Sequence, residues 1–255
     1  DPLIGQIFNV ILQGLGDMLV TTTLKDLGVK KKNALDMQER ELFTHTFNEC
    51  VRTLGVQAPS VFYSSKVQGT LIGQSLPPVM LIGDQMRKGQ TDQELAFVLA
   101  KVLTYFHPLH MAVGVLPIET LEFIFAGALK LCIAEYDVGP LAKDTNFLEL
   151  LEAMNGMPPQ LRQSLQRYVG DFARRGRRPN LRRWLNQIEL SANHAGLLMC
   201  GDVGVAGKVI KSESHRTMFT APGRLSTRDK LVDLATFAMS QQYLDLRQRL
   251  ELTIE

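Results

Sequence analysis

Apolar residues recur along most of the chain at the spacing of amphipathic helices. Between Leu3 and Leu19 they fall close to every 3.6 residues, the period of one helix face. Similar patterns predict further helices over residues 36–54, 94–105, 118–134, 145–154, 159–174, 181–199, 202–211 and 226–250. Gly55 follows the second helix, where a glycine in the left-handed conformation would end it. The pattern therefore predicts a mainly helical protein.

The pattern changes between residues 60 and 82. Three short runs there are rich in β-branched and aromatic or apolar residues, at residues 61–63, 70–72 and 79–82. Glycines and the Pro77-Pro78 pair separate them. We expect a small antiparallel sheet of about three strands, packed on the helix over residues 94–105. The predicted fold class is thus α+β, mainly helical.

Length and composition are those of a folded globular chain. The 255 residues suffice for one large domain, and 45% apolar with 21% charged residues is an ordinary composition. A net charge of +2 gives no general preference for an acidic partner. Cys50, Cys132 and Cys200 are odd in number and far apart, which predicts buried thiols in a reducing, cytoplasmic environment rather than disulfides. Because the chain starts at Asp1 rather than Met, we expect a fragment of a longer protein.

Two apolar stretches could be mistaken for membrane spans. A spanning helix needs about 20 predominantly apolar residues, and charges within it are costly. Residues 3–20 contain Asp17 and several amides, and residues 111–134 contain Glu119, Glu122 and Lys130. We therefore expect core helices and no transmembrane segment.

Candidate chemistry centres on the helix over residues 94–105. Four segments resemble the CAAX-endopeptidase and HtpX-like gluzincin metallopeptidases in order and spacing. They are residues 58–70, 77–86 and 91–100, which precede or belong to this helix, and residues 189–200 downstream. The resemblance covers about residues 50–210. It implies a zincin-like scaffold in a single domain, with packing helices at 1–57, the zincin-like core at 58–210, and a loop and helix at 211–255. Within that last part, residues 212–223 are predicted to form a mobile loop.

The resemblance also implies that the peptidase activity is lost. In His-Glu-x-x-His the two His bind zinc and the Glu polarises the attacking water. Lys101, Val102 and Tyr105 stand at those three positions, and none can do that chemistry at neutral pH. Glu189 matches the third zinc ligand of the family, whereas Asn193 replaces its orienting Asp. We therefore expect a pseudopeptidase without metal or other cofactor, in which a Lys101–Glu189 pair could replace the charge of the metal.

A different metal site could use His107 and His110 together with Glu189. Pro108 lies between the two histidines and disrupts the helical turn that would align them. We therefore interpret both histidines as ordinary residues at the end of a helix.

Loss of catalysis predicts a protein-binding or scaffolding role, with a protein or peptide as partner. The strand formed by Val79, Met80, Leu81 and Ile82 is the candidate sheet edge for adding a peptide strand. One alternative is an enzyme that uses Glu189 as an acid or base, with Tyr105 or Lys101 assisting, either without metal or with an atypical one. Another is a helical interaction module whose cleft is filled by side chains.

A basic run gives a further alternative, binding to an anionic surface or nucleic acid. Its members are Arg174, Arg175, Arg177, Arg178, Arg182 and Arg183. Tyr168, Phe172 and Trp184 lie nearby and could stack on bases. The simpler interpretation is a solvated corner between two helices, because cations are favoured at a helix C-terminus.

Overall fold

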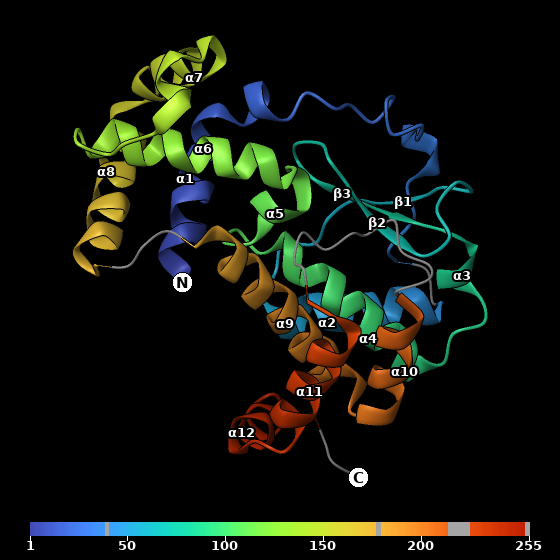
Figure 1. The fold of residues 1–255 in the computed structure, drawn as a ribbon. Helices are drawn as coiled ribbons and strands as arrows, with labels where there is room; N and C mark the ends of the chain where they lie inside the picture. The colour runs from blue at the N-terminus through green and yellow to red at the C-terminus, as the bar shows by residue number, and fades with distance from the viewer. Residues whose placement is uncertain (39–40, 177–179, 214–224, 253–255) are drawn as a thin grey trace.

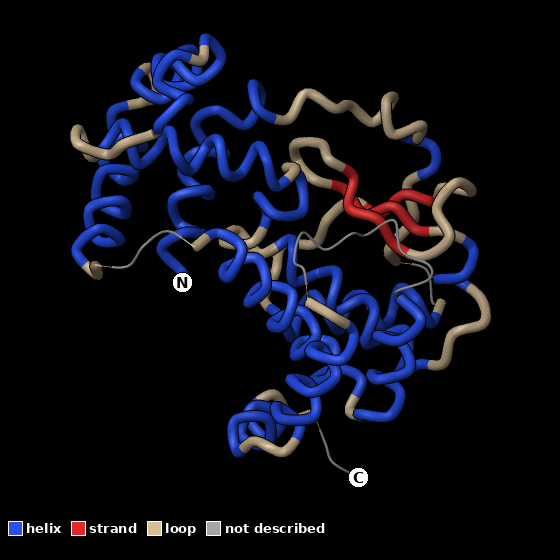
Figure 2. Tube along the Cα trace, in the orientation of Figure 1, coloured by secondary structure: helices blue, strands red, loops and turns tan. Residues whose placement is uncertain are grey.

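A computed structural model describes residues 1–255 except 39–40, 177–179, 214–224 and 253–255. Helices dominate it, and one small sheet lies at the side of the molecule (Figures 1 and 2). The α-helices are α1 (Pro2–Leu19), α2 (Leu42–Leu54), α3 (Asp84–Arg87), α4 (Asp92–Leu103), α5 (Met111–Val115), α6 (Ile118–Cys132), α7 (Thr145–Asn155), α8 (Pro159–Arg174), α9 (Leu181–Cys200), α10 (Val203–Glu213), α11 (Thr227–Ala238) and α12 (Gln241–Arg249). The 3₁₀ helices are η1 (Lys31–Asn33), η2 (Thr104–Phe106) and η3 (Gly139–Lys143), and the strands are β1 (Val61–Tyr63), β2 (Thr70–Gly73) and β3 (Val79–Ile82).

Helix ends follow local capping chemistry. Thr91 and Glu94 form a capping box at the start of α4, which satisfies backbone N–H groups that have no partner within the helix. Gly55 ends α2 with a φ of 61°, so the predicted left-handed cap is confirmed. The predicted helix over residues 36–54 begins later, at Leu42.

One predicted helix is two helices in the structure. The range 226–250 is divided between α11 and α12, and the prediction of one continuous helix is wrong. Ser240 causes the division, because its hydroxyl accepts a hydrogen bond from the Tyr243 N–H at 3.2 Å and caps a new helix.

The predicted sheet is present, but its polarity differs from the prediction. Its strand order is β1-β3-β2; β3 is antiparallel to β2 and parallel to β1, so the sheet is mixed. Val61 lies opposite Met80, while Thr70 lies opposite Ile82. Consecutive β2 and β3 pair as a hairpin, and β3 then lies between β2 and β1. The prediction of an antiparallel sheet is therefore wrong for β1.

The position of β3 also corrects the predicted peptide-binding edge. Val79, Met80, Leu81 and Ile82 are all buried, and β3 pairs with a strand on each side. Its backbone groups are thus used within the sheet, and β3 cannot accept an added strand. The outer side of β1 is also engaged, because the Leu35 N–H donates to Val61 O at 2.9 Å. The terminal strand on the other side is β2.

The helices form two groups around a continuous core (Figure 1). In one group α1 packs with α5, α6, α7 and α8, and in the other α4 packs with α2, α9 and α10. One face of the sheet contributes Met80 and Ile82 to the same hydrophobic cluster as Leu95 and Leu99 of α4. The C-terminal helices close a second cluster against Phe97.

The two apolar stretches that were considered as membrane spans pack as core helices. The first is α1, whose buried residues join the main cluster, and the second is divided between α5 and α6. Within the part of the chain that the structure describes, no helix has the length and apolar character needed to cross a bilayer. All three cysteines carry free thiols, and Cys50 and Cys200 are buried as expected, while Cys132 is half-buried.

The contact between α4 and α9 is the most extensive one between two helices of the fold, and Gly196 permits it. A methyl group at this position would lie 2.8 Å from two carbons of the Phe97 ring and 3.0 Å from Phe97 O. Such distances are shorter than van der Waals contact. The two helices can therefore come this close only because α9 has no side chain here.

We expect Gly196→Ala to destabilise the protein by about 1–3 kcal/mol, the usual penalty for an overpacked core. Gly170→Ala on α8 is the matched control, because no atom lies within 4 Å of its added methyl group. Alanine is the better helix former, so this control should gain up to about 1 kcal/mol. Urea unfolding measures both changes, and equal stability of the two variants would contradict this account of the α4–α9 contact.

Candidate functional site

The five residues that the resemblance aligns with the metal site lie in the protein interior. Lys101 and Val102 belong to the last turn of α4, Tyr105 to η2, and Glu189 and Asn193 to the middle of α9. Their exposed fractions do not exceed 5%. Because α4 and α9 pack against each other, residues far apart in the sequence meet here.

Lys101 pairs with a residue that was not predicted. Its Nζ lies 2.5 Å from Oε2 of Glu213, the last residue of α10. The ammonium side chain is 6% exposed and the carboxylate side chain 20% exposed. A charge this deeply buried needs an opposite charge beside it. Lys101 thus has Glu213 as its partner, and the possible Lys101–Glu189 pair is not formed.

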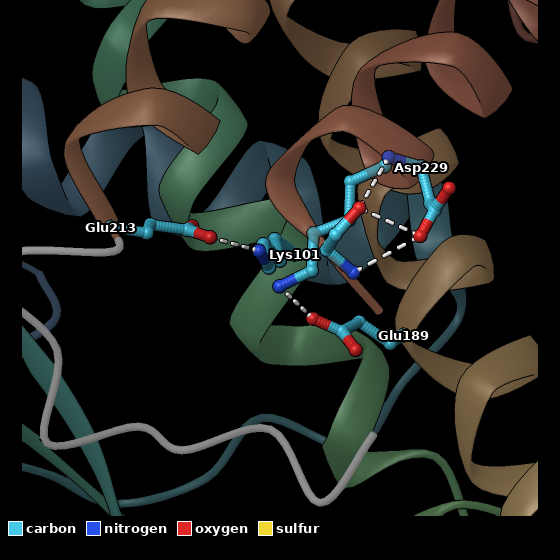
Figure 3. A network of polar contacts seen from close by, with 6 residues as sticks. Lys101, Glu189, Glu213 and Asp229 are labelled. Atoms are coloured by element: carbon cyan, nitrogen blue, oxygen red, sulfur yellow. Dashed lines mark hydrogen bonds and ion pairs between the residues drawn. The ribbon is translucent and has the colours of Figure 1, made fainter. Parts of the chain in front are cut away.

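Glu189 pairs with Lys230 in the first turn of α11, through Oε1 and the Lys230 Nζ. Figure 3 shows Lys101, Glu189, Glu213 and Asp229 gathered where the C-terminal helices meet α4 and α9. The two ammonium groups and two carboxylates of the Lys101–Glu213 and Lys230–Glu189 pairs cancel each other's charge. We refer to the side chains of these two ion pairs as the charge network.

Local capping chemistry orients Lys230. The Ser226 hydroxyl oxygen accepts a hydrogen bond from the Asp229 N–H at 3.1 Å, and the Asp229 carboxylate accepts one from the Ser226 N–H at 3.3 Å. This capping box fixes the first turn of α11. Lys230 follows Asp229 directly, so its direction is set by the same turn.

Tyr105 remains a neutral phenol in this environment. Burial raises its pKa well above the usual value of 10.0, and the nearby carboxylates of Glu189 and Glu213 raise it further. The neutral form cannot serve as a phenolate ligand to a metal or as a base. Both carboxylates influence Tyr105, which shows that it lies beside the charge network.

Asn193 adds a buried amide one helical turn beyond Glu189. Its exposed fraction is 0%, and among the described residues neither its Nδ2 nor its Oδ1 has a hydrogen-bond partner. The second oxygen of Glu189, Oε2, is likewise buried without a hydrogen-bond partner in the described part of the chain. Residues four apart lie on the same helix face, so this face of α9 offers polar atoms that Lys230 leaves unsatisfied.

The donor set does not suit a catalytic metal. Among the residues described, no three His, Cys, Asp or Glu side chains come together as a metal-binding group. His107 and His110 do not form such a group with Glu189. The Leu109 N–H donates to Nδ1 of His107 at 3.2 Å, and Nδ1 of His110 lies 3.1 Å from Thr104 O. These contacts agree with their interpretation as ordinary residues at a helix end.

The burial of Glu189 also affects whether it could act as an acid or base in a metal-free reaction. Its exposed fraction is 1%, and the Lys230 ammonium lies directly on one of its oxygens. An acid or base must come within hydrogen-bonding reach of the proton it transfers. In this conformation a dissolved substrate has no access to the Glu189 carboxylate.

Three arginines of the basic run have acidic neighbours in the described part of the chain. Arg174 pairs with Asp171, Arg175 lies 3.4 Å from an oxygen of Asp1, and Arg182 lies 3.9 Å from an oxygen of Glu122. Arg177 and Arg178 fall outside the described residues, as does most of the predicted loop at 212–223. The described arginines other than exposed Arg183 thus have carboxylates beside them, as expected for a solvated helix corner.

Glu213 and Lys230 are the two members of the charge network that sequence reasoning missed. Nothing in the sequence around Glu213 distinguishes it from a surface residue at a helix end. Ser226 and Asp229 have the spacing of a capping box, and this signal agrees with the predicted helix start at residue 226. It could not have shown that α11 packs on α9, so the partner of Lys230 stayed unknown.

Comparison of the chain with models of protein families, with curated proteins and with solved structures gives no match.

Proposed function

We propose that this chain is a catalytically inactive, peptidase-like domain that acts as a protein-binding or scaffolding module. The observation that carries the proposal is the charge network. Two Lys–Glu pairs, each with one buried member, occupy the region where the resemblance would place a zinc ion and its ligands. A metal-dependent hydrolase needs three protein ligands and an open coordination position for water. This interior offers two ammonium groups instead.

Burial of the aligned positions supports a binding role at the surface rather than in a cleft. Lys101, Tyr105 and Glu189 are covered by surrounding helices, which favours the interpretation of a site filled by side chains. A partner would then bind elsewhere, and the open edge of a sheet is a surface to which a peptide strand can add. Among the strands that the structure describes, β2 is the terminal one on the side away from β1.

The strand register identifies which β2 groups face outward. The Met80 N–H donates to Ser60 O at 2.9 Å, so the backbone of Met80 faces β1. Backbone direction alternates along a strand, and Leu81 therefore faces β2. Leu71 lies opposite Leu81 and faces back toward β3. The backbone N–H and C=O of Thr70 consequently face the outer edge of the sheet.

Replacing Thr70 by proline tests this edge. Proline removes an outward N–H while leaving the β2–β3 hydrogen bonds in place, a position where sheets tolerate it. Thr70→Val is the matched control, since it keeps the N–H and a β-branched side chain. For peptides selected from a random library on the native domain, we expect Thr70→Pro to weaken binding by roughly tenfold, about the contribution of one hydrogen bond with its desolvation.

Fluorescence anisotropy with those peptides measures the effect. Equal affinities for the proline and valine variants would show that peptides do not add to β2. Failure to select any peptide on the native domain would contradict a peptide-binding function.

Restoring the zinc ligands tests the peptidase resemblance itself. In the variant Lys101→His, Val102→Glu, Tyr105→His and Lys230→Ala, we expect about one zinc ion per chain, because Glu189 is then free to act as third ligand. The triple variant that retains Lys230 is the control and should bind zinc more weakly. Zinc titration with a competing chelator measures both, and no binding by either variant would show that this helix does not align with the metal motif.

A further inference from the structure

Glu189 requires a cation at its carboxylate. The side chain is 1% exposed and lies in the middle of α9, where water cannot solvate its charge. An isolated buried carboxylate is very costly, whereas a paired one is tolerated. Lys101, the nearest candidate from the sequence, is engaged with Glu213. The cation that meets Glu189 comes from α11, in the form of Lys230.

The polar groups around Glu189 exceed what Lys230 satisfies. An ammonium group has three N–H donors. Oε2 of Glu189 and Oδ1 of Asn193 are acceptors, and in the described part of the chain neither receives a hydrogen bond. The Asn193 side chain is completely buried, and it follows Glu189 by one turn on the same face of α9.

We propose that Glu189 and Asn193 form a binding site for a primary ammonium group, and that Lys230 is its intramolecular ligand. By occupying this site Lys230 holds the C-terminal helices on α9. This goes beyond the proposed protein-binding function and holds whether or not the chain derives from a peptidase.

Other contacts place α11 where Lys230 can reach the site. Leu234 and Phe237, four and seven residues after Lys230, are buried in the second hydrophobic cluster. His194 of α9 lies 2.6 Å from an Asp233 oxygen, and its ring stacks on Phe237 at 3.9 Å between centroids. The inner face of α11 is thus fixed on α9 by packing and by a second polar contact. The ammonium of Lys230 completes this face at its N-terminal end.

A double-mutant cycle separates the charge of Lys230 from its packing. Lys230→Met keeps most of the apolar stem but leaves Glu189 without its cation, so we expect the ratio of folded to unfolded protein to fall by roughly a hundredfold or more. Glu189→Gln in the same chain removes the unpaired carboxylate and should recover most of that loss. If Lys230→Met costs as much in the Glu189→Gln background as in the native one, the proposal is wrong and Lys230 acts by packing alone.

Chemical rescue tests the ammonium site directly. Lys230→Ala removes three methylenes and the ammonium, which together correspond to n-propylammonium. We expect n-propylammonium chloride to raise the melting temperature of Lys230→Ala more than sodium chloride does at equal ionic strength. Lys208→Ala, which changes an exposed lysine on α10, is the matched control and should show no such difference. An equal response of the two variants would overturn the proposal.

The outcome stays informative if Lys230→Ala does not fold. Folding of the combined Glu189→Gln, Lys230→Ala variant would then support the site, because the uncompensated carboxylate is the cause of the failure. If the combined variant also fails to fold, Lys230 is needed for reasons other than its pairing with Glu189, and the proposal is wrong. Neither result bears on peptide binding at β2, so the two proposals can fail separately.

Discussion

The buried carboxylate of Glu189 sets a constraint that the surrounding helices satisfy. Gly196 lets α9 pack closely on α4, and Glu189, two turns earlier on α9, is almost fully buried. Once the charge is buried it needs a counter-ion, and only a positive group delivered at the right place can supply it. The capping box at Ser226 and Asp229 starts α11 so that Lys230 arrives there. The packing of the C-terminal helices therefore depends on the charge of α9.

A buried ion pair adds little net stability compared with a well-packed apolar pair, but it is costly to break. Two adjacent pairs, Lys101–Glu213 and Lys230–Glu189, consequently act more as a requirement for correct arrangement than as a source of stability. They fix α10, which supplies Glu213, on α4, and α11, which supplies Lys230, on α9.

Local sequence patterns predicted the elements well because helix periodicity and capping are local properties. The helix at residues 159–174 and the three strands were located closely, and Gly55 ends α2 as predicted. The strand order was not predictable in this way, because tertiary packing decides which strand lies between the other two. The same limit applies to the site. The sequence indicated Lys101 and Glu189 as buried charges, but their partners Glu213 and Lys230 are set by tertiary packing.

The central claim is that a protein ammonium group, rather than a metal ion, neutralises Glu189. Inductively coupled plasma mass spectrometry of the native protein, loaded with excess zinc and then dialysed extensively, tests it most directly. The account predicts far less than one zinc per chain, with no difference between the native protein and Glu189→Gln. About one zinc per chain, lost in Glu189→Gln, would contradict it and would identify Glu189 as a metal ligand.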